Sequence, residues 1–362
     1  MNFLQSVDGE ALRYGRLIGT GGIGTGMVFM LEGNHTLGRN ESRLGALVPY
    51  RDYCKLHIIA HYIAVLLGAA ACRFAVHAIG KIGHDDPGAS LLDQMRGVGM
   101  DVRAVETAEN AVTLFSACFQ YPDSSGGNVT TSNSASALVS PEDAEAALAG
   151  IPRDACSEIV LAVPEVPVAA RIALLCAGKR RGCLTVASLL SHEAAAFAAE
   201  NAWETIDVLA VNIDEAAAIA GGDAHRHAAR KTAEACAGVL FGRNAKMRVV
   251  VTDGKNGSYA FAGGSCAHMP ALPVQAVSTG GAGDAFLAGM VAGLCCGLPF
   301  LPEAEGGSLS GAMGLGTLLA AFSVTSPHTI HPDACADALA LWAWAQDVPI
   351  WGDLARLLPR RQ

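Results

Sequence analysis

Apolar runs alternate with alanine-rich stretches along most of this chain, most regularly from about residue 141 to residue 330. The apolar runs are typical of buried strands, and the alanine-rich stretches between them are typical of helices. Strands joined by helices form mainly parallel sheets that are covered on both faces, so the pattern predicts an α/β fold. The predicted strands are 73–80, 159–164, 183–190, 208–212 and 248–254, and the predicted helices include 141–150, 165–182 and 214–222.

The first 135 residues follow a different pattern. Residues 26–36 and 112–132 resemble short strands joined by turns rich in glycine, asparagine and serine, as in antiparallel sheets. We expect them to form a small sheet that stands off the main domain. Neither a repeat nor a long linker divides the chain, so we treat residues 1–362 as a single domain.

Composition narrows the class of function. The chain has 362 residues, of which 51% are hydrophobic, so it is long enough to bury a large core. Its net charge of −9 excludes the broad positive field of a nucleic-acid-binding domain. Chemistry on a small soluble molecule is the expectation that remains.

Cysteine usage and the apolar runs predict a cytoplasmic protein. The eleven cysteines are odd in number and include no C-x-x-C pair, which favours reduced thiols over a disulfide framework. The N-terminus lacks the basic and apolar segments of a signal peptide. The apolar runs at 57–72 and 285–301 fall short of the ~20 residues that a membrane-spanning helix needs, so we expect buried helices and no membrane association.

The stretch GTGGIGTG at residues 19–26 matches the dinucleotide pattern G-x-G-x-x-G through Gly19, Gly21 and Gly24. That pattern binds a dinucleotide only where it opens a helix and an acidic residue follows about 20 residues later. Here a short apolar run and a turn follow, and Glu41 lies in a polar stretch. A dinucleotide-dependent oxidoreductase therefore rests on these glycines alone, and their context does not favour it.

A second glycine-rich stretch, VSTGGAGDAFLAGMVAGL at 277–294, leads directly into an apolar helix. Backbone N–H groups that converge at a helix N-terminus stabilise an anion such as a transferring phosphoryl group. Asp284 at the start of this helix is suited to accept a proton from a substrate hydroxyl. From these residues alone, a glycine turn with Asp284 as a helix cap remains an equal alternative.

The segment STGGAGDAF resembles the DTxGAGD signature of the PfkB/ribokinase family of carbohydrate kinases. The resemblance extends to residues 78–102, which are similar to the family's G-x-x-G-x-D-x-x-G segment. Three further motifs follow in the family's order at the ends of predicted strands: Glu165-Val166-Pro167, Asn212-Ile213-Asp214-Glu215 and Thr252-Asp253-Gly254. The chain is therefore identified as a member of that family.

The resemblance implies a ribokinase-like three-layer sandwich with a mainly parallel central sheet and a small β-rich lid from about 20–50 and 105–135. It implies an ATP-dependent kinase that transfers the γ-phosphate to a hydroxyl of a small sugar or sugar-like substrate. A nucleoside kinase of the same fold and a non-catalytic ligand-binding protein on the kinase scaffold remain alternatives. An exposed edge strand on the lid invites a second copy, so we expect a homodimer.

The resemblance also assigns roles to residues. Asp284 is the expected catalytic base, and Gly281, Ala282 and Gly283 supply the anion hole. Mg²⁺ is expected to be held through water, which suits its preference for few protein ligands. The expected nucleotide-binding residues are Asn212, Glu215, Thr252, Gly254 and Gly257, with Asn212 and Glu215 also holding the metal and 308–324 flanking the adenine. Taken singly, Asn212 is equally a helix cap and Thr252 a turn residue.

Two departures from the family concern the cation and the acceptor. Ser278 replaces the usual acidic residue of the signature, which weakens any K⁺ site. The early aspartate and the G-G-x-x-x-N motif are absent. We expect Gly21 and Gly22 to form a close turn under the lid, and the candidate substrate-binding residues are these two with Asn40, Arg43, Arg51 and His57.

Several of the charged residues near the substrate side are cations. They suggest an acidic or phosphorylated acceptor, because arginine matches carboxylate and phosphate; a solvated charged loop is the alternative. His57 and His61 are one helical turn apart, but they lack the glutamate and third ligand of a zinc site.

Overall fold

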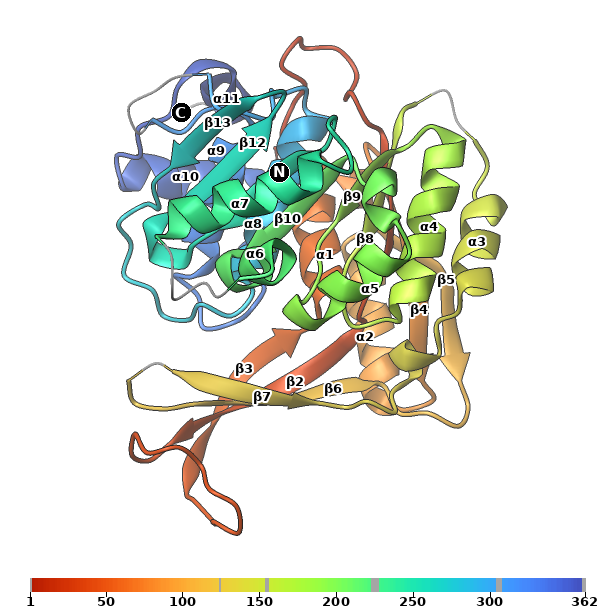
Figure 1. Ribbon diagram of the computed structural model, residues 1–362, viewed down its shortest axis with the longest axis vertical. Helices are drawn as coiled ribbons and strands as arrows, with labels where there is room; N and C mark the ends of the chain where they lie inside the picture. Colours follow the sequence, from red (N-terminus) through yellow and green to blue (C-terminus); the bar gives the residue numbers. More distant parts are fainter. Residues whose placement is uncertain (1, 124, 154–155, 223–227, 304–307, 360–362) are drawn as a thin grey trace.

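The computed structural model describes residues 2–123, 125–153, 156–222, 228–303 and 308–359. Its main sheet has nine strands in the order β13-β12-β11-β10-β9-β8-β1-β4-β5 (Figure 1). The pairs from β5 to β11 are parallel, while β12 and β13 add an antiparallel edge. The strands are β1 Arg16–Thr20, β4 Ala75–Gly83, β5 Met100–Ala108, β8 Glu158–Ala162, β9 Leu184–Ala187, β10 Val208–Asn212, β11 Arg248–Thr252, β12 Ser258–Ala262 and β13 Ser265–Met269.

Helices cover both faces of this sheet, as the continuous apolar strands require. On β8, Ile159 and Leu161 face one core cluster, and Val160 and Ala162 face the other. The first face carries α1 Lys55–Leu67, α2 Asp86–Gly97, α8 Ala282–Cys295, α9 Gly311–Ser323, α10 Ala336–Ala345 and α11 Gly352–Leu357. The second face carries α3 Pro141–Gly150, α4 Val168–Arg181, α5 Ala194–Ala199, α6 Ile213–Ala220 and α7 Ala229–Phe241.

The two long apolar runs of the sequence form α1 and α8, and both helices are buried in the first core cluster. Among the described residues, none of the helices has the length and apolar character to cross a bilayer. The runs are apolar because neighbouring protein surrounds these helices.

A second sheet of four strands projects from the main one (Figure 1). Its order is β3-β2-β6-β7, with β2 paired parallel to β6 and antiparallel to β3. We call it the small sheet; its strands are β2 Gly24–Leu31, β3 Gly45–Tyr53, β6 Leu114–Gln120 and β7 Gly126–Thr130. Of the two lid segments expected at about 20–50 and 105–135, the second begins too early, because β5 extends to Ala108 in the main sheet.

The glycines at 19–26 let the chain pass from β1 into β2 against close neighbours, and β2 is a strand rather than the helix that a dinucleotide site requires. A Cβ added at Gly22 would lie 2.2 Å from Glu165 Oε2, and one at Gly26 would lie 2.4 Å from Asp52 Oδ2. Side chains therefore occupy the space above these glycines. The dinucleotide interpretation loses the only observation that supported it.

Candidate active site

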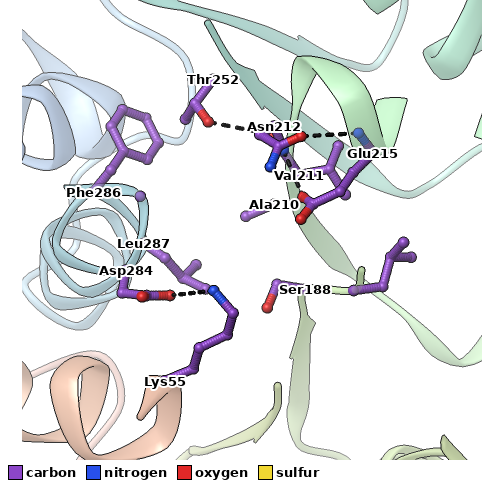
Figure 2. A pocket seen from close by; sticks show the side chains of 12 residues that line it. Lys55, Ser188, Ala210, Val211, Asn212, Glu215, Thr252, Asp284, Phe286 and Leu287 are labelled. Atoms are coloured by element: carbon purple, nitrogen blue, oxygen red, sulfur yellow. Dashed lines mark hydrogen bonds and ion pairs between the residues drawn. The ribbon is translucent and has the colours of Figure 1, made fainter. Parts of the chain in front are cut away.

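A pocket lies where the carboxyl ends of β9, β10 and β11 meet the N-termini of α1 and α8. Ligands of parallel α/β sheets commonly bind at this edge. The pocket is partly open, and its volume of about 80 Å³ is ample for a few water-sized polar groups. The lining residues are Lys55, Ser188, Leu189, Ala210, Val211, Asn212, Glu215, Thr252, Gly283, Asp284, Phe286 and Leu287 (Figure 2).

Asp284 is in the first turn of α8, and its side chain is 14% exposed. Its Oδ1 lies 3.5 Å from Nζ of Lys55, which reaches across from α1 (Figure 2). Burial raises the pKa of Asp284 and the Lys55 ammonium group lowers it, because an opposite charge favours the ionised form. The predicted base is therefore a carboxylate at the pocket wall with a cation beside it.

The turn before α8 exposes backbone donors to the same pocket. Gly281 has φ 77°, and a Cβ there would meet Thr329 O at 2.9 Å, so this turn needs glycine. The Ala282 N–H donates to Thr279 O at 3.3 Å. Among the described residues no group accepts from the N–H groups of Gly283 and Asp284. Of the predicted set 281, 282 and 283, only the Ala282 N–H is used within the turn, since no acceptor for the Gly281 N–H lies among the described residues either.

Asn212 and Glu215 form a reciprocal cap at the start of α6. Asn212 Oδ1 accepts from the N–H groups of Asp214 and Glu215 at 2.9 Å, and the Asn212 N–H donates to Glu215 Oε2 at 2.7 Å. Asn212 therefore does act as the helix cap that the sequence allowed as an alternative role. Both side chains also line the pocket, and burial raises the pKa of Glu215 to about 7.

The residues expected to hold Mg²⁺ form a sparse site. Clusters of three or more His, Cys, Asp or Glu side chains around a possible metal do not occur in the part of the chain that the structure describes. The cap uses one oxygen of Glu215, so the second carboxylate oxygen remains for the pocket. One carboxylate and one amide fit an ion that keeps most of its waters and binds substrate phosphates.

The remaining nucleotide-binding candidates separate into two groups. Thr252 lines the pocket and donates from Oγ1 to Val211 O at 3.5 Å. Gly254 and Gly257 are in the turn that leads to β12, outside the lining residues. Gly257 has φ 98°, and a Cβ there would be 2.1 Å from Met269 O, so it serves the turn itself.

Three residues without a predicted role belong to this site. Lys55 pairs with Asp284, and Glu165 Oε2 accepts from the Lys55 N–H at 2.9 Å. Ser188 Oγ, at the end of β9, is buried without a described partner and faces the pocket (Figure 2). A polar residue inside the predicted apolar strand 183–190 was the available signal for Ser188. Lys55 was one of the cations expected near the substrate side, and its pairing with residue 284 emerges from the structure.

The structure brings Gly21 and Gly22 close to this region, next to Val163 and Glu165. It does not bring the other described substrate candidates there. Asn40 is exposed in the loop that joins β2 to β3, and Arg43 bonds to Glu41 and to His35 O in the same loop. His57 is fully buried, with both ring nitrogens unpartnered among described residues. The Arg51 side chain lies outside the described part of the structure.

The sequence profile described as "pfkB family carbohydrate kinase" matches residues 59–335. The chain belongs to the pfkB family. Among curated relatives, a fructokinase of Klebsiella pneumoniae is 54% identical over 52 residues, 14% of this chain and 17% of the relative. An inositol 3-kinase of Zea mays is 39% identical over 84 residues, 23% and 20% of the two chains. These matches span about a fifth of each curated relative.

Solved structures extend the pfkB likeness to the fold. A ribokinase from Cryptococcus neoformans var. grubii in complex with ADP superposes with a TM-score of 0.71 at 18% identity, over 90% of this chain and 99% of that one. A nucleoside kinase from Burkholderia thailandensis in complex with inosine gives 0.69 at 16% identity, over 93% and 100%. The predictions of family and of fold class are confirmed.

Proposed function

We propose that this protein transfers the γ-phosphate of ATP to a hydroxyl group of a small polyhydroxylated molecule. The observation that carries the proposal is the position of Asp284, whose carboxylate lines a pocket together with the open N–H groups at the start of α8. A proton acceptor next to an anion-binding helix end is what attack by an alcohol on phosphorus requires.

In the proposed reaction, the acceptor oxygen attacks the γ-phosphorus, and the bond from that phosphorus to the ADP leaving group breaks. Asp284 takes the proton of the attacking hydroxyl. The N–H groups of Gly283 and Asp284 and the dipole of α8 stabilise the charge on the phosphoryl oxygens. The reaction needs no covalent intermediate on the protein.

The other side of the pocket would hold the donor. Asn212, Glu215 and Thr252 line that side (Figure 2). Mg²⁺, when bound with ATP, supplies positive charge that neutralises the phosphates. Asn212 and Glu215 would orient its water shell. Ser278 Oγ accepts from the Gly280 N–H at 3.3 Å and offers no carboxylate, so we expect at most weak dependence on K⁺.

The charges around Asp284 favour a neutral acceptor. Asp52, Glu165 and Glu215 all interact unfavourably with the Asp284 charge, and the nearby Lys55 is already paired with Asp284. Arg43, which suggested an acidic acceptor, is bound within the β2–β3 loop. A carboxylated or phosphorylated acceptor would add like charge here. The neutral acceptor classes that we propose are sugars or polyols, and nucleosides.

The small sheet would act as a lid over the acceptor, excluding water from the transferring phosphoryl group. Its edge strands β3 and β7 carry the exposed apolar residues Leu47 and Val129, which suit pairing with a second copy. We therefore propose a homodimer, which light scattering on the purified chain would test. We also propose a location in the cytoplasm, which cell fractionation would test.

The reaction is tested by coupled detection of ADP with purified protein, ATP and Mg²⁺ across sugars, polyols, sugar acids and nucleosides. We expect ADP formation to depend on one neutral acceptor, with a phosphorylated product of matching mass. The non-catalytic alternative predicts acceptor binding in a thermal-shift assay without acceptor-dependent ADP. That result would refute the proposed enzyme.

A further inference from the structure

We propose that Lys55 is a positioning residue that acts through Asp284, because its ammonium group keeps the buried carboxylate ionised and able to accept a proton. The proposal rests on the proposed phosphoryl transfer and adds a residue for which the family motifs provide no role. At the start of α1, where the resemblance leads us to expect paired glycines, this chain has Cys54 and Lys55.

The fold fixes where the ammonium group lies. Lys55 is the first residue of α1, and its N–H donates to Glu165 Oε2 at 2.9 Å. The Tyr53 N–H donates to Thr329 Oγ1 at 3.0 Å, and the Cys54 N–H donates to Gly24 O at 3.2 Å. Three consecutive backbone groups are therefore anchored to three separate segments. The side chain starts from a fixed point and reaches Asp284 across the pocket (Figure 2).

The surroundings of Asp284 make this cation necessary. Lys55 and Tyr62 face Asp284 from α1, Asp52 from β3, Glu165 from the turn after β8, and Glu215 from α6. Of these groups only Lys55 favours the ionised form of Asp284. Burial and neighbouring acids oppose ionisation. Without the amine, Asp284 would hold its proton at a higher pH.

Lys55 itself does not titrate in the working range. The charge of Asp284 raises the pKa of Lys55 well above its usual value, with smaller contributions from Glu165 and Glu215. The Lys55 ammonium group is therefore charged throughout the neutral and acidic pH range of the experiments below. We expect the proton on Asp284 to contribute to the acidic limit of activity together with that on Glu215, whose pKa burial raises to about 7.

The experiment measures the pKa of Asp284 by ¹³C NMR of carboxyl-labelled protein, with its signal assigned through Asp284→Asn. In Lys55→Met we expect this pKa to rise by at least about one pH unit. In Lys55→Arg, which keeps the charge, it should stay close to the native value. Lys246→Met removes an exposed lysine and should leave the titration unchanged. Lys55→Gln provides a second neutral variant if Lys55→Met does not fold.

The same variants give a kinetic readout. The acidic limb of the pH profile of kcat/KM should move to higher pH in Lys55→Met and Lys55→Gln. For each pH unit that the limb moves, activity on the acidic side should fall about tenfold. Raising the pH should restore activity, and Lys55→Arg should keep the native limb.

An unchanged Asp284 titration in both neutral variants, or an equally raised Asp284 pKa in Lys55→Arg, overturns the proposal. Because NMR needs no turnover, its result stands even if the protein proves not to be a kinase. Failure of the inference about Lys55 is therefore distinguishable from failure of the proposed function.

Discussion

Glu165 accepts a hydrogen bond from the Lys55 N–H at 2.9 Å and thereby connects the turn after β8 to the start of α1. Glu165 is held at φ 78°, which is uncommon for a residue with a side chain. This contact joins residues 110 positions apart in sequence and places Lys55 at the pocket.

Glu165→Ala should destabilise the protein, because it removes the acceptor at the N-terminus of α1. We expect a loss of about 1–2 kcal/mol in the free energy of unfolding, the usual scale for a lost cap or a buried unsatisfied donor. Glu165→Gln keeps a carbonyl oxygen and should lose less. Denaturant titration checks both, and equal stability of Glu165→Ala and the native protein would contradict the capping role.

His57→Leu should make the protein less sensitive to acid. Burial lowers the pKa of His57 to about 3, so the unfolded chain binds the proton near pH 6.5 while the folded chain does not. Stability is therefore lost as pH falls below about 6.5, by about 1.4 kcal/mol per pH unit for a single such group. Thermal unfolding at pH 8 and pH 5 measures the effect.

The native protein should lose more stability between these two pH values than His57→Leu does. Glu165 and Glu215, whose pKa values are raised to about 7, change stability with the opposite sign, since the folded state retains their protons between about pH 4.5 and 7. The native protein and His57→Leu both carry these acids, so the difference between their stability losses reports on His57. Identical losses would show that His57 is not buried as described.

Gly22→Ala should destabilise the link between β1 and β2, because its Cβ would lie 2.2 Å from Glu165 Oε2 and 2.6 Å from Glu165 Cβ. Overpacking of this kind costs about 1–3 kcal/mol. Gly97→Ala is the matched control, since nothing lies within 4 Å of a Cβ at that helical position. A loss in both variants, or in neither, would contradict the close approach.

Arg43→Gln should leave the KM of the acceptor within about twofold, because Arg43 is bound to Glu41 and to His35 O in the β2–β3 loop. Neutral acceptors should also have a higher kcat/KM than their carboxylated counterparts. A large rise in the KM of the acceptor for Arg43→Gln, or a preference for sugar acids, would contradict this prediction and support the acidic acceptor that the sequence suggested.

The sequence predicts the parts of this molecule that depend on local pattern. The buried strands 208–212 and 248–252 follow from continuous apolar runs, and the helix 141–150 has the bounds of α3. The hairpin of β12 and β13 interrupts the expected alternation. The edge strand β13 carries mostly exposed residues, so it lacks the apolar signal of a central strand, although β12 beside it is mostly buried.

The sequence motifs predict residues that the structure brings to one pocket, as at Asp284 and Asn212, while their roles stay predictions. The role of Lys55 was not predictable, because it depends on a contact across 229 positions that no local pattern encodes. The sequence also suggested substrate contacts for Arg43 and His57. The first finds its partners in its own loop, and the second is enclosed by the core around Tyr53 and His61.

The most direct test of the account is turnover by Asp284→Asn with saturating ATP, Mg²⁺ and the identified acceptor. We expect kcat to fall by at least about 10²-fold, the lower range for loss of a positioned general base, while ATP binding measured by calorimetry stays nearly unchanged. Asp93→Asn, which alters an exposed carboxylate on α2, should keep native kcat. Native kcat in Asp284→Asn would contradict the assignment of Asp284 as the base.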